Sequence, residues 1–244
     1  MKLRLKITKE AEIRFISHLE YLRTLGRAIR RSKIPAAYSE GFNPHLKFSL
    51  ASALGVGVVS YAEFAEIELA EPAEAALCAK ALAKAMPRGI RVLAADIVDS
   101  KRAALMSQAA GASYRVTVPC PGDPEAVAAR FNEEKALLFK KAAPKTKAKF
   151  KEIDVKFYIP RLKARSLGAQ AVFTFDCRIT PEGSMKAVDL LNALNEHYGL
   201  GVRVELADIE RLKLYRVDKR GRKLSLLEKD AFIMPQEAMS GLQA

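Results

Sequence analysis

The sequence predicts an α+β protein whose secondary-structure elements run twice through the order β-α-β-β-α-β. Three observations lead to this prediction. Short segments that alternate polar and apolar residues, typical of half-buried strands, recur in both halves of the 244 residues. Two segments with helical spacing separate the strands in each half. Residues 100–112 lie between the halves and have the composition of a connection. Two tandem ferredoxin-like domains with antiparallel sheets have this order of elements.

The first predicted domain covers residues 1–99. Leu3, Leu5 and Ile7 alternate with lysine and arginine, which predicts an opening half-buried strand over residues 2–8. The remaining expected elements are a helix at 18–33, extended segments near 36–50 and 58–70, a helix at 72–86 and a strand at 90–98.

The second predicted domain covers residues 113–217. Asp123 and Pro124 predict a helix start, because proline suits the first turn and an acid suits its positive end. The other expected elements are strands at 114–118, 151–159 and 170–179, a helix at 185–198 that ends at Gly199, and strands at 202–206 and 211–217. Residues 218–244 have no counterpart in the first domain, and we expect a basic and flexible tail there.

A net charge of +13 is the first indication of function. Residues 1–110 hold 17 Lys and Arg against 11 Asp and Glu, and residues 111–244 hold 24 against 17. Both halves are therefore basic, which favours a polyanion as partner, while a generally basic solvated surface is the alternative. The N-terminus lacks the apolar core of a signal peptide and no apolar run reaches 18 residues, so we expect a cytoplasmic protein without a membrane partner.

Residue spacing gives no sign of a cofactor or metal site. The three cysteines lie 42 and 57 residues apart, which fits neither a zinc nor an iron–sulfur motif. The sequence also lacks a phosphate-binding loop, a nucleophile elbow and a dinucleotide fingerprint. We therefore expect no metal and no cofactor in this chain, and binding rather than catalysis.

The segment RFISHLE at 14–20 predicts the start of the first helix. Ser17 can cap the helix, and Glu20 can reach back to complete a capping box. No acid occurs between residues 21 and 33, so the cations of this helix repel one another unless a polyanion relieves them. The candidate phosphate ligands here are Arg14, Arg23, Arg27, Arg30 and Arg31.

The segment YSEGFNPHLK at 38–47 predicts a turn at Gly41 followed by a strand. Alternation places Asn43, His45 and Lys47 on the side opposite Phe42, Leu46 and Phe48. An amide, an imidazole and an ammonium on one edge suit phosphate or base-edge contacts. We expect these three side chains, with Tyr38 nearby, to form one positive cleft with the arginines of the first helix.

His18 and His45 are the weak candidates for catalysis. Histidine titrates near neutrality and can act as a general acid or base, so a metal-independent ribonuclease is conceivable. The two residues lie 27 positions apart without an orienting carboxylate nearby in the sequence. The pair is therefore a poor match to a catalytic site.

Residues 135–165 form a second basic segment, with 11 Lys and Arg against two acids. Basic residues mixed with aromatic ones suit single-stranded RNA, where phosphates pair and bases stack. The candidate contacts are Lys145, Lys147, Lys149 and Tyr158. Phe157 shares its side of the expected strand with Ile153 and Val155, so we assign it to the core.

The two N-terminal segments carry a resemblance to a known family. RFISHLE at 14–20 and YSEGFNPHLK at 38–47 resemble the bacterial proteins described as radical-SAM-associated or radical-SAM-linked, and the likeness continues through KEIDVKFYI at 151–159 and RITPEGS at 178–184. Members of that family usually have NPHPK where this chain has Leu46. The tandem architecture also looks like the RAMP superfamily of CRISPR RNA-processing proteins.

The resemblance implies partnership with a radical SAM enzyme, which would carry the iron–sulfur cluster and S-adenosylmethionine. This chain has no C-x-x-x-C-x-x-C motif and cannot hold the cluster itself. The leading hypothesis is an RNA-binding accessory module that presents RNA to that enzyme. The alternatives are a protein-interaction module that docks the enzyme without contacting RNA, and the ribonuclease.

Overall fold

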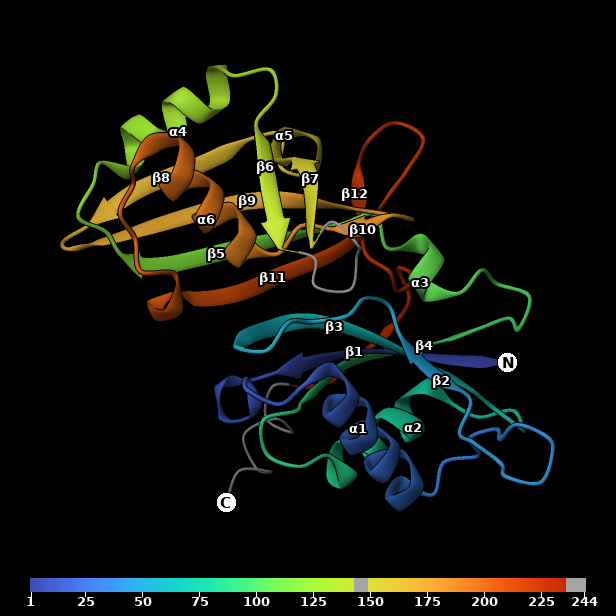
Figure 1. Cartoon of the computed structure of the whole chain (residues 1–244). Coiled ribbons are helices and arrows are strands. Elements are labelled where there is room, and N and C mark those ends of the chain that lie inside the picture. Colours follow the sequence, from blue (N-terminus) through green and yellow to red (C-terminus); the bar gives the residue numbers. More distant parts are fainter. Residues whose placement is uncertain (143–148, 236–244) are drawn as a thin grey trace. The chain divides into compact units, whose positions relative to one another are not determined.

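The computed structural model describes residues 1–142 and 149–235. They divide into two compact units (Figure 1). Unit 1 comprises Met1–Ala109 and Lys213–Ala244, and unit 2 comprises Ala110–Leu212. The chain is a mixed α+β protein, and the strand pairs given below are antiparallel. Within the described residues, no helix is both long and apolar enough to cross a membrane.

The described part of unit 1 contains a sheet and three α-helices. Its elements in chain order are β1 (Lys2–Lys9), the 3-10 helix η1 (Ala11–Ile13), α1 (His18–Ser32), β2 (Phe48–Leu50), β3 (Val58–Glu68), α2 (Ala75–Ala85), β4 (Val92–Val98), α3 (Leu105–Gln108), β12 (Lys223–Leu224) and β13 (Phe232–Ile233). Strand pairing gives the order β2-β3-β1-β4-β13. Helices α1 and α2 lie side by side next to these strands (Figure 1).

The core of unit 1 lies between β1 and the two long helices. Leu3, Leu5 and Ile7 are buried there with Tyr21 and Leu25 of α1, as the alternation of the first strand predicts. At about 25 cal/mol per Å² of apolar surface, this burial is the main stabilising contribution to the unit.

The opposite side of β1 is also buried, which the alternation did not predict. Arg4 is fully buried, and its Nε donates to a Glu66 carboxylate oxygen at 2.9 Å while its Nη2 donates to the Ala103 carbonyl at 2.6 Å. The prediction that one side of this strand is exposed is therefore wrong. A buried guanidinium requires such partners, because an unpaired buried charge is strongly destabilising.

Helix α1 begins and ends at residues with identifiable roles. The Ser17 hydroxyl accepts a hydrogen bond from the Glu20 backbone amide at 3.1 Å, which confirms the predicted cap. The buried Lys9 ammonium donates to the Arg14 and Ile16 carbonyls just before the helix. At the other end Lys33 has φ 57° and closes the helix in the left-handed region.

The segment 36–50 is mostly a loop instead of the expected extended strand. Only Phe48–Leu50 forms a strand, and isolated bridges join Ala36 to Leu69 and Tyr38 to Leu46. Gly41 has φ 109°, which turns the chain back on itself. The predicted alternation therefore does not extend through residues 39–45.

Unit 2 contains strands, two long helices and a separate hairpin. Its elements are β5 (Gly111–Pro119), α4 (Pro124–Glu133), β6 (Leu138–Ala142), β7 (Phe150–Asp154), α5 (Val155–Tyr158), β8 (Leu162–Leu167), β9 (Gln170–Thr180), β10 (Gly183–Ser184), α6 (Ala187–Tyr198), the 3-10 helix η2 (Val204–Leu206) and β11 (Asp208–Val217), which continues into unit 1. Strand β9 pairs with β5, β8 and β10. The cap at Asp123 and the C-terminal Gly199 are as predicted.

Two predicted strands of unit 2 have a different structure. Residues 151–159 were expected as one strand, but they form the end of β7 and the helical turn α5, and β7 pairs with β6 as a two-stranded hairpin. Asp154 causes the change, because its carboxylate accepts from the Lys156 amide at 3.0 Å and starts the turn. Residues 202–206, also expected as a strand, contain η2.

The expected connection and tail both contain regular structure. Residues 100–112 include α3 and the start of β5, and the boundary between the units falls after Ala109. Residues 218–235 form β12 and β13, with Leu226, Leu227 and Met234 buried, so this part of the tail packs into unit 1. Residues 236–244 lie outside the described chain.

Candidate nucleic-acid interface

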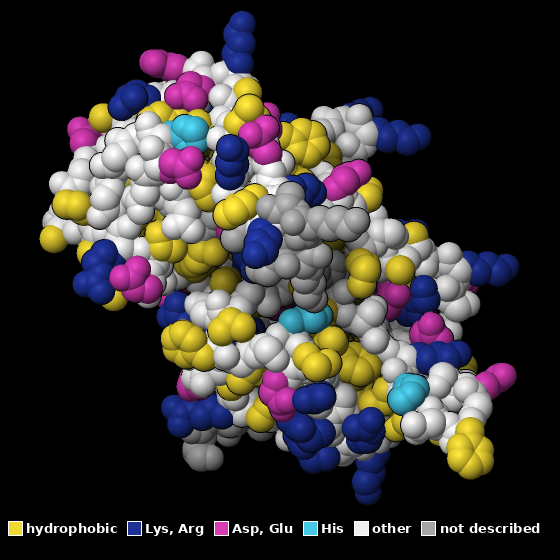
Figure 2. Space-filling view, in the orientation of Figure 1, with side chains coloured by type: hydrophobic (Ala, Val, Ile, Leu, Met, Phe, Trp, Pro, Cys, Tyr) yellow, Lys and Arg dark blue, Asp and Glu magenta, His cyan; other side chains and the backbone are white. Residues whose placement is uncertain are grey.

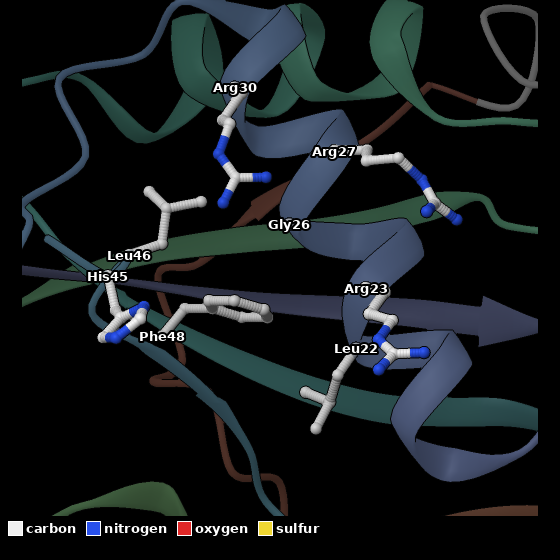
Figure 3. Close-up of a pocket in the computed structure, with 8 residues that line it drawn as sticks. All are labelled: Leu22, Arg23, Gly26, Arg27, Arg30, His45, Leu46 and Phe48. Carbon is white, nitrogen blue, oxygen red and sulfur yellow. The ribbon is translucent and has the colours of Figure 1, made fainter. Parts of the chain in front are cut away.

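A groove of about 350 Å³ lies in unit 1 between α1 and residues 45–48 (Figure 3). We call it the α1 groove. Its lining consists of Leu22, Arg23, Gly26, Arg27, Arg30, His45, Leu46 and Phe48. It therefore joins the two segments that the sequence singled out.

The floor of the α1 groove is apolar. Leu22, Leu46 and Phe48 are half-buried and pack against the core of unit 1. Gly26 is buried on the same side of α1, and a Cβ built on it would lie 3.6 Å from the nearest Phe48 ring atom. Gly26 therefore lines the groove without adding a side chain to its floor.

Three arginines of α1 supply the positive charge, and Figure 2 shows Lys and Arg side chains gathered over this helix. Glu20 pairs with two of them, Arg23 at 3.5 Å and Arg27 at 2.8 Å. The pKa of the Glu20 carboxyl is lowered, mainly by the hydrogen bond that Arg27 donates to it. The prediction of uncompensated cations is wrong for this pair of arginines. Exposed ion pairs contribute little in water, so a phosphate can compete with Glu20 for both.

Arg30 differs from the other two arginines. Its guanidinium points toward Phe48, whereas that of Arg27 points away from the ring (Figure 3). Within the described residues, Arg30 has no hydrogen-bonded or ion-paired partner for its guanidinium. The α1 groove thus contains one cation that is available without displacing an acid.

His45 reaches the α1 groove from the loop that follows Gly41. The loop is closed by two hydrogen bonds with Ser39, whose amide donates to the His45 carbonyl at 2.8 Å and whose hydroxyl accepts from the His45 amide at 2.9 Å. His45 and Leu46 both line the groove, and their side chains extend in opposite directions from the chain (Figure 3). Lys47 instead pairs with Glu68 at 3.6 Å, and Asn43 is exposed in the loop outside the groove lining.

The other predicted ligands of unit 1 have structural contacts. The Arg14 Nε donates to the Gly57 carbonyl at 2.9 Å, and the Arg31 Nη2 donates to the Ala85 carbonyl at 2.7 Å, at the end of α2. Tyr38 is exposed and forms a backbone bridge with Leu46. None of the three lines the groove.

The two candidate catalytic histidines are not both in the groove. His18 is the first residue of α1, is half-buried and does not line the groove. His45 lines it without a carboxylate among the lining residues. Residues 1–142 and 149–235 contain no group of three or more His, Cys, Asp or Glu that could hold a metal ion.

The second basic segment lies in unit 2 and differs from its prediction. Tyr158, the expected stacking residue, is buried, while Phe157, assigned to the core, is exposed with the Arg178 guanidinium 5.8 Å from its ring centre. The helical turn α5 is the reason, because side chains in a helix do not alternate between two sides. Lys149 is exposed, and Lys145 and Lys147 lie outside the described residues.

Sequence reasoning missed Gly26 and the role of Phe48. A glycine inside an amphipathic helix lowers helix stability, and that cost is a signal of a local packing or binding requirement. Phe48 was assigned to the side away from the charged residues, since the loop geometry was not foreseen. Both residues belong to the floor of the α1 groove.

The fold and the groove define an α+β protein with a basic, apolar-floored groove on its first long helix. The sequence matches the family described as "Uncharacterized protein conserved in bacteria (DUF2344)" over residues 2–189, and the chain belongs to this family. No curated protein matches the sequence.

Solved structures that resemble the chain include the following two. A chain of a Cbf5-Nop10-Gar1 complex has a TM-score of 0.51 and 12% identity, over 89% of this chain and 50% of that one. The present chain therefore spans about half the length of that chain, and the likeness supports the mixed α+β fold alone. An unknown protein from Galdieria sulphuraria has a TM-score of 0.22 and 16% identity, over 86% and 97% of the two chains.

Proposed function

We propose that this chain is an RNA-binding accessory module that presents RNA to a partner radical SAM modifying enzyme. The observation that supports the proposal most is the α1 groove, in which Arg23, Arg27 and Arg30 and the imidazole of His45 surround an apolar floor. Cations suit the phosphates of RNA, and an apolar floor suits its bases.

The three arginines follow one side of α1. Their spacing of four and three residues spreads them over about 10 Å along the helix axis, at 1.5 Å per residue. A row of this length can contact more than one phosphate of an extended strand. Each phosphate that is neutralised releases counterions, which makes the affinity depend on salt.

The competing functions have less support in the groove. A ribonuclease that uses a histidine pair would need a second titratable group beside His45, and His18 does not line the α1 groove. A surface that only docks an acidic protein would not need an apolar floor that contains Phe48 and Gly26. RNA binding accounts for both the charge and the apolar floor.

We also propose that each unit has the ferredoxin-like topology. In unit 1 the strand order β4-β1-β3-β2 agrees with this topology, in which the fourth and third strands flank the first. In unit 2 the order β11-β5-β9-β8 agrees in the same way, with the β6–β7 hairpin inserted after α4. A tandem of two such units is similar in architecture to RAMP-type RNA-binding proteins.

Partnership with a radical SAM enzyme is supported by the position of the family resemblance. Residues 14–20 and 38–47 carry that resemblance, and the groove is built by the helix that follows the first segment and by the end of the second. The partner would supply the iron–sulfur cluster and S-adenosylmethionine. This chain would bind the RNA and position it.

Salt-dependent RNA binding by the full chain tests the proposal. Affinity for a fluorescently labelled single-stranded RNA, measured by anisotropy at several salt concentrations, should fall steeply with salt. Arg27→Ala should weaken binding and reduce the slope of log affinity against log salt by about one unit. Lys80→Ala, which removes one exposed charge from α2, is the matched control and should change the slope less. Unchanged binding after joint substitution of Arg23, Arg27 and Arg30 by alanine would exclude the α1 groove.

Two further measurements separate the alternatives. Co-purification of the chain with a radical SAM enzyme, with and without ribonuclease treatment, shows whether RNA is part of the complex. A complex that survives the treatment, together with no direct RNA binding, would support the protein-interaction module. RNA cleavage in the presence of a chelator, lost in His45→Ala, would support the ribonuclease.

A further inference from the structure

We infer that the α1 groove holds the flat face of one unpaired base against Phe48 and Arg30, beside Gly26, which adds no side chain to the lining. This inference rests on the proposed RNA binding and names its substrate class. The ligand is a nucleotide without a pairing partner, in a single-stranded segment or a loop. Duplex RNA would bind only through its phosphates.

Gly26 is the first observation behind the inference. It lies inside α1, where glycine lowers helix stability relative to alanine. It is not among the glycines with positive φ, so its backbone conformation is open to any residue. A Cβ at this position would meet Phe48 ring atoms at 3.6 and 3.7 Å, which is ordinary van der Waals contact. Neither the backbone nor the packing requires glycine here, and Gly26 is one of the residues that line the groove.

Phe48 and Arg30 are the second observation. The Phe48 ring extends toward Gly26, and the Arg30 guanidinium points into the same space (Figure 3). The Arg30 Nη1 would lie 4.0 Å from a Cβ on Gly26. Unpaired bases stack on aromatic rings and on guanidinium planes, so these two side chains are the groups that a single base needs.

The chemistry of the floor is the third observation. Leu22, Gly26, Leu46 and Phe48 offer no side-chain hydrogen-bond donor or acceptor. Such a floor contacts the face of a base and leaves its edges unread, so binding should tolerate different bases. In a duplex both faces of an internal base are already stacked, and only an unpaired base can turn one face to Phe48.

The test uses the full chain and an RNA oligomer that carries one 2-aminopurine, whose fluorescence is quenched when it stacks. The same oligomer is supplied single-stranded and fully paired. The wild-type chain should bind the single strand at least fivefold more tightly than the duplex and quench its fluorescence. Base–aromatic stacking is worth about 1–3 kcal/mol per base, which corresponds to about 5- to 150-fold in affinity.

Gly26→Ala is the decisive variant, because it retains every charge and has room for the added methyl group. It should lose most of the preference for the single strand and most of the quenching of 2-aminopurine fluorescence. The slope of log affinity against log salt should stay unchanged. Phe48→Leu removes the ring but preserves an apolar side chain, and it should have the same effect. Arg27→Ala should do the opposite, lowering the salt slope and retaining the preference.

The outcomes separate this inference from the proposed function. If the wild-type chain binds neither form of the RNA, both are overturned. If it binds with the expected salt slope but Gly26→Ala and Phe48→Leu leave the preference and the quench intact, only the inference is overturned. Equal wild-type affinity for the single strand and the duplex would overturn it as well.

Discussion

The hydroxyl of Tyr21 in α1 donates a hydrogen bond of 2.8 Å to the backbone carbonyl of Thr8 in β1. Both residues are buried in unit 1, so the bond fixes the helix to the strand in a dry environment. The same helix carries the arginines of the α1 groove, and its position against β1 therefore determines where those arginines lie.

Removal of this hydroxyl should destabilise the protein. Tyr21→Phe leaves the buried Thr8 carbonyl without this donor, and we expect a loss of about 1–2 kcal/mol in the free energy of unfolding. Urea titration followed by circular dichroism measures the loss. Tyr38→Phe, at an exposed tyrosine, is the control and should stay within about 0.5 kcal/mol of the wild type. Equal effects of the two substitutions would contradict the role of the bond.

Tyr21 should also make stability fall at alkaline pH. Burial, and then the nearby negative charge of Glu63, raise the pKa of Tyr21 well above its ordinary value of 10.0. Between pH 10 and the folded pKa, the unfolded chain releases a proton that the folded chain retains, so this contribution is complete below pH 10 and declines above it. The decline approaches about 1.4 kcal/mol per pH unit for one such group. Urea titrations at several pH values above 10 should show that the free energy of unfolding falls less steeply with pH in Tyr21→Phe than in the wild type. An equally steep fall would rule Tyr21 out as the cause.

The cap of α1 should contribute measurably to stability. Ser17→Ala removes the acceptor of the Glu20 amide and should cost about 1 kcal/mol in the free energy of unfolding. Thermal or urea unfolding provides the value. Ser100→Ala, at an exposed serine outside the helices, serves as the comparison and should be nearly neutral.

Gly26→Ala should stabilise the fold. The substitution raises helix propensity and packs a methyl group at 3.6 Å from the Phe48 ring, so we expect a gain of about 0.5–1 kcal/mol. Gly41→Ala is the matched comparison: Gly41 has φ 109°, and the same change should destabilise there. A destabilised Gly26→Ala would show that the space beside Phe48 is smaller than the structure indicates.

Local signals in the sequence were sufficient to predict the ends of several helices. Ser17, Asp123 and Gly199 act within three or four residues of their own positions, as caps and as a left-handed terminator. Their partners are adjacent backbone groups that any helix offers. The sequence alone therefore specified these helix ends.

Non-local partners explain most of the errors. Arg4 was expected in water, but its partner Glu66 lies 62 positions later and meets it only when β1 pairs with β3. Alternation also failed where a helical turn replaced a strand, as at Tyr158. The cations of the α1 groove were foreseen from the helix pattern, whereas its floor depends on the fold of a loop.

The position of strand β13 in the chain affects the order in which unit 1 can fold during synthesis. Phe232 and Ile233 pair with Ala95 and Ala94 of β4, although unit 2 lies between these segments in the chain. Chains emerge from the ribosome from their N-terminus, so unit 2 can fold while β4 still lacks this neighbour. Until β13 arrives, that side of β4 presents unpaired backbone groups to other strands in the cell. A segment made after unit 2 therefore covers the side of a strand made before it.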